Sequence, residues 1–376
     1  MNSFQGHPGV HRAAPATTRK PRFFVGIQVL RGIAAMLVVA YHLVDAELVH
    51  GRGVQLMDGL ARFGFAGVDI FFVISGFVMT TIATGRYASP AAAGQFLLRR
   101  AIRILPLYWI YTSVIVAILL LAPHALDAMY RDKSVLASYL LWPQEGRPLL
   151  QVGWTLIYEG FFYLMMAGAI AFVPQRAVGG YLLAWAGGLL WLQFNPVTTP
   201  WVGVVASPMG WEFIAGALVG CYARRLPGRA GGPLLACGTA AFVAAALVLN
   251  GMDLTEQRPL LRTLTFGACS VLIVLGLALR EPASARDGRG LFERIGDASY
   301  SIYLSHLFVL SAAARAWSAS GMNTTVGEHV IFLLATMVTS ILVGWVSYRF
   351  IERPLLTLSS AYLTRRQRAA ASLAAP

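Results

Sequence analysis

Apolar windows of similar length recur along almost the whole chain. Each holds roughly 17 to 23 residues, the number that an α-helix needs to cross the hydrocarbon of a bilayer. Short polar connections separate the windows. The pattern predicts an all-α polytopic membrane protein, a single bundle of about ten transmembrane helices. The predicted spans are 27–48, 63–84, 104–122, 152–173, 178–194, 207–223, 233–250, 260–279, 296–317 and 329–351.

Composition and charge agree with this pattern. Hydrophobic residues make up 57% of the 376 residues and charged residues only 12%, which excludes a soluble domain of this size. The net charge of +13 would also suit a nucleic-acid partner. However, about 20 Lys and Arg fall on one side of the predicted bundle and roughly 7 on the other, which is the positive-inside pattern. The basic residues therefore orient the helices, and we expect both termini in the cytoplasm.

The sequence divides into one membrane domain and two tails. Residues 1–25 are basic and lack an apolar core, so they predict a flexible cytoplasmic tail and no cleavable signal peptide. Residues 26–354 form the predicted membrane domain, and residues 355–376 a short basic cytoplasmic tail. Cys221, Cys237 and Cys269 have no metal-ligand spacing, so we expect neither a metal site nor a disulfide framework.

Two ionisable residues, Arg31 and His42, lie inside the first predicted span. A separation of eleven residues places them on nearly one helix face, about 16 Å apart along the axis. Ionisable groups at membrane depth face a bundle interior or a wet cavity and mark functional sites. In the alternative reading, Arg31 only extends to the cytoplasmic surface and His42 marks the other interface. The shared face favours a groove for a long ligand.

Asp69 lies well inside the second apolar window. An unpaired carboxylate in hydrocarbon is costly, so we expect Asp69 to be neutral, hydrated or paired with an Arg or His of another helix. The alternative is a position at the membrane interface.

Arg100 and Arg103 stand just before the third predicted span, at what we expect to be its cytoplasmic mouth. Their three-residue spacing places both guanidinium groups on one helix surface, which suits the clamping of phosphate from the cytosol. Orientation of the helix would by itself explain one or two of these arginines.

The fourth and ninth spans also carry polar groups. Glu159 lies about two turns into the fourth span, near Trp154 and Tyr158, whose rings and hydroxyl suit a vestibule that contacts a sugar. An interfacial aromatic belt is the alternative. In the ninth span, Tyr303 and His306 share one polar face with Tyr300, and we expect them to contact an acceptor as well. His306 by itself would also suit a hydrogen-bonded structural role.

These groups suit acyl transfer from a thioester. Arginines near the cytoplasm would hold the phosphates of an acyl-CoA while its acyl-pantetheine arm extends toward His42. His42 would act as general base on an acceptor hydroxyl, with Asp69 or Glu159 orienting its ring. A transient acyl-histidine is a further chemical route. The sequence carries no G-x-S-x-G elbow, P-loop, HExxH or Rossmann glycine pattern in a suitable context.

In their order along the chain, several of these segments resemble the acyltransferase-3 family of membrane acyltransferases, which includes bacterial O-antigen and exopolysaccharide O-acetyltransferases. The fourth-span segment is most similar to the ExoZ-like branch that functions in exopolysaccharide production. The matching segments run from about residue 25 to 356 and read LRGIAAMLVVAYH, GVDIFFVISGF, RRAIRILPLYW, GWTLIYEGFFY, SYSIYLSH and FIERPL.

The resemblance implies a ten-helix bundle in the bacterial inner membrane that transfers an acyl group, usually acetyl, from cytosolic acyl-CoA to a glycan or lipid-linked saccharide. His42 matches the catalytic histidine, and Arg31 is its partner in the Arg-x10-His pair. Arg100 and Arg103 match the arginines on the acyl-CoA side, and Glu159 matches the acidic position of the fourth-helix motif. No tightly bound cofactor is implied, and association with polysaccharide assembly machinery is a further expectation. The family does not identify the acceptor.

Two other functions fit the composition. A transporter or flippase of a saccharide lipid would use the intramembrane charges as a proton path. A non-catalytic subunit would present a glycan to a polymerase. The ordered motifs favour the enzyme.

Overall fold

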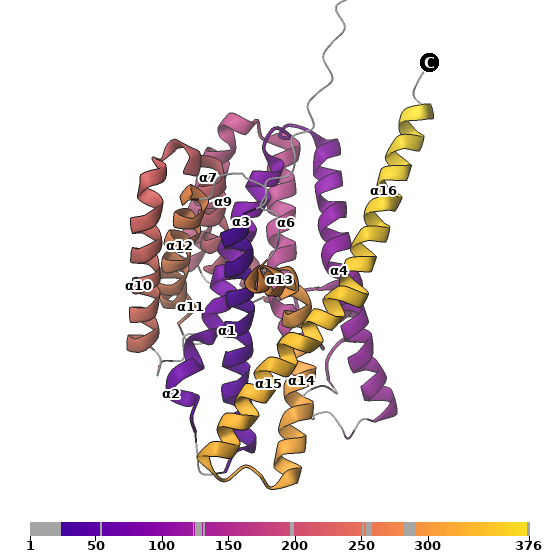
Figure 1. Cartoon of the computed structure of the whole chain (residues 1–376). Helices are drawn as coiled ribbons and strands as arrows, with labels where there is room; N and C mark the ends of the chain where they lie inside the picture. The colour runs from indigo at the N-terminus through magenta and orange to yellow at the C-terminus, as the bar shows by residue number, and fades with distance from the viewer. Residues whose placement is uncertain are drawn as a thin grey trace, which may run out of the picture.

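The computed structural model describes residues 24–52, 55–122, 124, 130, 132–195, 199–249, 252, 258–280 and 290–373, and every regular element in them is helical. The long helices lie side by side as one bundle (Figure 1). Nine segments of this part of the chain are long and apolar enough to cross a membrane. The prediction of an all-α polytopic membrane protein is therefore confirmed.

Each predicted span coincides with one helix or with consecutive helices. The principal elements, in chain order, are α1 (Val25–His50), α2 (Asp58–Ala61), α3 (Gly67–Ala83), α4 (Pro90–Leu121), α5 (Val135–Leu140), α6 (Trp154–Phe172), α7 (Val178–Phe194), α8 (Pro200–Val205), α9 (Met209–Tyr222), α10 (Gly231–Leu249), α11 (Pro259–Arg262), α12 (Ala268–Arg280), α13 (Leu291–Asp297), α14 (Ser299–Ser320), α15 (Val326–Ser347) and α16 (Arg353–Leu373). One π-helical turn, Thr263–Gly267, joins α11 to α12 and another, Tyr348–Glu352, joins α15 to α16.

The ninth predicted span coincides with α14, which is not one of the nine apolar segments. At 22 residues α14 is long enough to cross hydrocarbon. Its polar positions face protein, because α14 packs on both α1 and α15, and Ser301, Ser305 and His306 are at most 1% exposed. The sequence pattern therefore placed this helix correctly, and the bundle interior holds its polar face.

The predicted start of the third span was wrong. The predicted span began at residue 104, whereas α4 begins at Pro90. Ser89 caps the helix, because its side chain accepts a hydrogen bond from the Ala92 N–H at 3.2 Å. The first turns of α4 hold small residues and are followed by Arg99, Arg100 and Arg103, so the apolar window did not include them. As a result, Arg100 and Arg103 lie inside the helix and not at its end.

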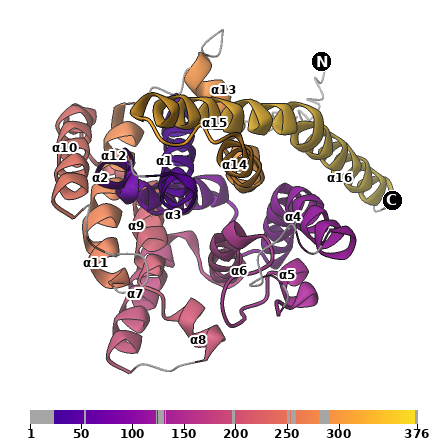
Figure 2. The same cartoon turned by 90° about the horizontal axis from the view of Figure 1, so that it is seen from below.

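The C-terminal segment forms a helix. Residues 355–373, which we expected to be part of a short tail, belong to α16, which continues α15 through the π-helical turn. α16 extends away from the bundle, toward the end from which α1 starts (Figures 1 and 2). Residues 1–23 of the predicted N-terminal tail lie outside the described residues.

The centre of the bundle depends on a close approach of α3 and α9. Gly76 of α3 and Gly216 of α9 face the backbone of the partner helix, and a Cβ at either would collide with a carbonyl oxygen, of Phe213 or Val73 respectively. Small residues at such crossings allow helix backbones to approach within van der Waals distance. This contact holds α3 in place beside α1, α6 and α12, which it also contacts.

We expect Gly216→Ala to lower the free energy of unfolding by about 1–3 kcal/mol, because the added methyl group forces the two backbones apart. Gly188→Ala in α7 is the matched control, since a Cβ there meets no atom within 4 Å. Unfolding of the two purified proteins in detergent measures the difference. Equal stability of the two variants would contradict the role given to this crossing.

Candidate active site

A cavity of about 240 Å³ lies among α1, α3, α4, α6 and α14. A larger depression of about 700 Å³ lies along α10 and α12, but small and aliphatic residues line almost all of it. The smaller cavity is the better candidate for a functional site, because its lining combines charged, hydroxyl and aromatic groups. Its polar lining residues are Arg31, Ser75, Arg100, Arg103, Thr155, Glu159, Tyr163, Ser299, Tyr300 and Tyr303.

Three arginines meet at this cavity from two helices. Arg31 comes from α1, and Arg100 and Arg103 come from α4. Within the described residues, no carboxylate lies within ion-pair distance of any of the three, and Arg100 Nε is buried without a hydrogen-bond partner. Glu159 lines the same cavity, so one carboxylate faces three guanidinium groups, and this excess of positive charge favours an anion among them. Arg100 and Arg103, which their spacing predicts to bind phosphate, thus share this cavity with Arg31.

Glu159 faces the same cavity from α6. Its Oε1 accepts hydrogen bonds from the Ser75 hydroxyl at 2.9 Å and from the Tyr163 hydroxyl at 2.5 Å. The bond from Ser75 connects α6 to α3, the bond from Tyr163 lies within α6, and together they fix the carboxylate inside the cavity. Its recorded partners are hydroxyl groups, so the expectation that Glu159 orients His42 gains no support from its contacts.

Tyr303 of α14 forms part of one boundary of the cavity. Its hydroxyl lies 2.8 Å from the Thr155 hydroxyl and 3.1 Å from the Val152 carbonyl oxygen. The ring of His306, one turn further along α14, follows at a centroid distance of 6.0 Å. His306 therefore lies next to the cavity, behind Tyr303, and is not among the described residues that line it.

His42 lies beyond this boundary. Its ring is 5.2 Å from the His306 ring, and its Nδ1 is 3.7 Å from Oδ2 of the exposed Asp45. The side chain is 17% exposed. Among the described residues that line the cavity, Arg31 is present and His42 is not. His42 is therefore connected to the cavity only through the ring contacts of His306 and Tyr303, and the single groove predicted for Arg31 and His42 stays a prediction.

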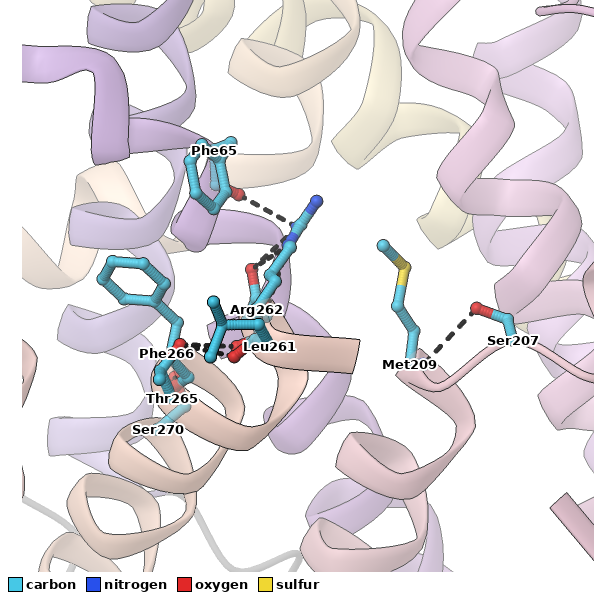
Figure 3. A network of polar contacts seen from close by, with 9 residues as sticks. Phe65, Ser207, Met209, Leu261, Arg262, Thr265, Phe266 and Ser270 are labelled. Atoms are coloured by element: carbon cyan, nitrogen blue, oxygen red, sulfur yellow. Dashed lines mark hydrogen bonds and ion pairs between the residues drawn. The ribbon is translucent and has the colours of Figure 1, made fainter. Parts of the chain in front are cut away.

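Asp69 is paired with an arginine that the sequence analysis did not identify. Arg262 Nε donates to both carboxylate oxygens at 3.0 Å, and its Nη2 donates to Oδ2 at 2.7 Å. Nη2 also contacts the Phe65 carbonyl oxygen at 3.3 Å, as Figure 3 shows. Both side chains are at most 2% exposed. The predicted pairing with an arginine of another helix is confirmed, and the role of orienting His42 gains no support from these contacts.

Glu47 is a buried acidic residue that the sequence analysis also missed. Glu47, near the end of α1, accepts a hydrogen bond from His329 Nδ1 of α15 at 2.8 Å. It also accepts from the backbone N–H groups of Leu56 and Met57, at 3.0 and 2.8 Å. Both Glu47 and His329 are at most 1% exposed. This network connects the ends of two helices and the following segment, which gives it a structural role. The acid and the histidine, 282 positions apart, carry no sequence signal of their contact.

Trp154 and Tyr158, the other residues expected to contact an acceptor, pack on each other with ring centroids 5.6 Å apart. Tyr158 also lies against Phe72, which lines the cavity. Their helix reaches the cavity through other positions, Thr155, Leu156, Glu159 and Tyr163. Of the predicted acceptor residues, only Tyr303 is in the described cavity lining.

The chain is similar to several known proteins. A family described as an acyltransferase domain matches residues 24–349. The exopolysaccharide production protein ExoZ of Rhizobium meliloti (strain 1021) is 34% identical over 310 residues, which cover 78% of this chain and 90% of ExoZ. Nodulation protein 10 of Rhizobium leguminosarum bv. viciae is 26% identical over 344 residues, which cover 81% of this chain and 85% of that protein.

A third relative covers less. The O-acetyltransferase OatA of Staphylococcus aureus (strain NCTC 8325 / PS 47) is 28% identical over 170 residues, which cover 42% of this chain and 26% of OatA. No solved structure matches the chain.

We expect Arg262→Leu to lower the free energy of unfolding by about 3–5 kcal/mol, because it leaves the Asp69 carboxylate buried without its partner. The double variant Asp69→Leu with Arg262→Leu removes both charges and should recover much of this loss. Denaturant unfolding in detergent measures the free energy of unfolding of the wild type, the single variant and the double variant.

The exposed pair Arg62–Asp58 supplies the control. Arg62→Leu should cost less than about 1 kcal/mol, because water screens an exposed ion pair. A loss for Arg262→Leu no larger than that for Arg62→Leu would rule out a structural role for the buried pair.

Proposed function

Because the chain belongs to the acyltransferase-3 family of membrane acyltransferases, we propose that it transfers an acyl group, with acetyl as the expected one, from cytosolic acyl-CoA to a hydroxyl group. The proposed acceptor is a cell-surface polysaccharide or its lipid-linked precursor, and the proposed location is the bacterial inner membrane with both termini in the cytoplasm. Acyl-CoA is a co-substrate in this proposal, and no tightly bound cofactor takes part.

The observation that supports acyl-CoA as the proposed donor is the cavity lined by three arginines. Arg31, Arg100 and Arg103 face one space without an ion pair to a carboxylate in the described part of the chain. Acyl-CoA carries phosphate groups at one end and a thioester at the other. The arginines would bind the phosphate end, and the apolar part of the lining, which includes Phe71, Phe72 and Leu156, suits the pantetheine arm.

In the proposed reaction, His42 takes the proton of the acceptor hydroxyl while its oxygen attacks the thioester carbonyl. The new C–O bond forms and the C–S bond breaks, so the ester and the thiolate of CoA are produced. The proton then passes from His42 to the thiolate, and the histidine returns to its neutral state. No net proton is consumed, so the reaction needs no proton path across the membrane.

The proposed acceptor comes from the relatives. One is named for exopolysaccharide production and another for O-acetyl transfer. On the protein itself, Tyr303 at the cavity boundary and the half-buried ring pair of Trp154 and Tyr158 supply hydroxyl and aromatic surfaces of the kind that bind sugars.

Transfer is tested with the purified protein in liposomes, radiolabelled acetyl-CoA and polysaccharide from a strain that lacks this gene. Labelled ester in the polysaccharide, absent with His42→Ala, is the expected result. Movement of a saccharide lipid across the liposome membrane without ester formation would overturn the proposal in favour of a transporter. Unchanged ester formation in His42→Ala would overturn the proposed base.

The division of roles between the arginines and the histidine gives a second test. Arg100→Ala or Arg103→Ala should weaken acyl-CoA binding by about 10- to 100-fold, because a charge-assisted contact to phosphate is lost. His42→Ala should instead lower kcat by about 10²- to 10⁴-fold with binding nearly unchanged.

Equilibrium binding and steady-state kinetics on the same preparations separate the two effects. Arg176→Ala is the control, because Arg176 is exposed on a connecting segment away from the cavity lining. Equal losses of acyl-CoA affinity in the arginine and histidine variants would contradict this division.

A further inference from the structure

His306 has an unsatisfied nitrogen in the middle of the bundle. The residue is 0% exposed, and its Nδ1 lies 3.3 Å from the Ile302 carbonyl oxygen. A carbonyl oxygen only accepts hydrogen bonds, so this contact requires the proton on Nδ1 and leaves the lone pair on Nε2. Nε2 is buried and has no hydrogen-bond partner among the described residues. Such a buried acceptor is costly unless a donor reaches it in some state of the protein.

The ring of His42 lies beside the ring of His306, and no other ring contact of His306 in the described part of the chain is shorter. The two ring centroids are 5.2 Å apart and the planes are tilted by 35°. This separation suits imidazoles that meet edge to edge through one N–H···N hydrogen bond of about 2.9 Å. Forming that bond requires rotation of the half-buried His42 ring, because His306 is held by its contact with the Ile302 carbonyl oxygen.

Other groups that would orient His42 are engaged elsewhere or exposed. Asp69 is bound to Arg262, Glu159 to two hydroxyl groups, and Glu47 to His329. Asp45 lies 3.7 Å from His42, beyond hydrogen-bond distance, and its side chain is 60% exposed. A general base needs a fixed partner that selects its tautomer. The buried group in position to serve is His306.

We propose that His306 is a positioning residue for His42. Its Nε2 accepts a hydrogen bond from Nε2–H of His42, which keeps the lone pair of His42 on Nδ1, the nitrogen that faces Asp45 and the more exposed side. When His42 takes the acceptor proton, the same bond stabilises the imidazolium. This inference rests on the proposed function, because it takes His42 as the base.

Kinetics of His306→Ala and His306→Gln test the proposal, with purified protein, acetyl-CoA and the polysaccharide used above. His306→Ala should lower kcat by about 100-fold while the KM for acetyl-CoA stays within about threefold. His306→Gln, whose amide oxygen retains an acceptor, should recover at least about tenfold of that loss. Asp45→Asn is the control and should stay within about fivefold of the wild type, because an exposed contact contributes little.

Three results would overturn the inference. Equal kcat for His306→Ala and the wild type would show that His42 needs no such partner. Equal loss in His306→Ala and His306→Gln, with acetyl-CoA binding and thermal stability both reduced, would show a purely structural role. A loss in Asp45→Asn as large as that in His306→Ala would assign the positioning role to Asp45. Failure of the proposed function itself is distinguishable, because the wild-type protein would then form no ester.

Discussion

A charged side chain surrounded by hydrocarbon has to be paired, hydrated or neutralised, and this constraint separates the buried Asp69–Arg262 pair from the arginines of the cavity. Asp69 and Arg262 satisfy each other through three hydrogen bonds and connect α3 to α11. The arginines of the cavity have no such carboxylate partner within the described residues. The buried pair stabilises the bundle. The arginines share their cavity with Glu159 and have room for water or an anionic ligand, which is why we propose the site there.

The site depends on helices that are far apart in the sequence. α1 contributes Arg31 to the cavity and His42 beyond it, while α14 contributes Tyr303 and His306 between these two. In the proposed reaction, a donor that enters beside the arginines would meet Tyr303 first, and His42 follows through its ring contact with His306. Such a division suits a reaction whose two substrates come from opposite sides of a membrane. The close crossing of α3 and α9 supports the arrangement, because α3 contributes much of the apolar lining.

The sequence predicted the helices better than their contacts. Hydropathy is a local property, so the spans were recognisable, and only the polar start of α4 and the helical continuation into α16 were not. The need of Asp69 for a partner was predictable from its surroundings, but the identity of Arg262 was not, since 193 positions separate the two. A search for single arginines inside other apolar windows would have found it. The proximity of His42 and His306 is likewise a tertiary contact without a local pattern.

The account depends on one claim, that an acyl-CoA binds with its phosphates at the three arginines and its thioester toward Tyr303 and His42. The most direct measurement is an experimental structure of the full chain in lipid with a non-hydrolysable acetyl-CoA analogue. The account predicts phosphate density beside Arg100 and Arg103 and the acyl end at the tyrosine boundary. An analogue bound outside the cavity, or one that enters from the side of Asp45, would contradict it.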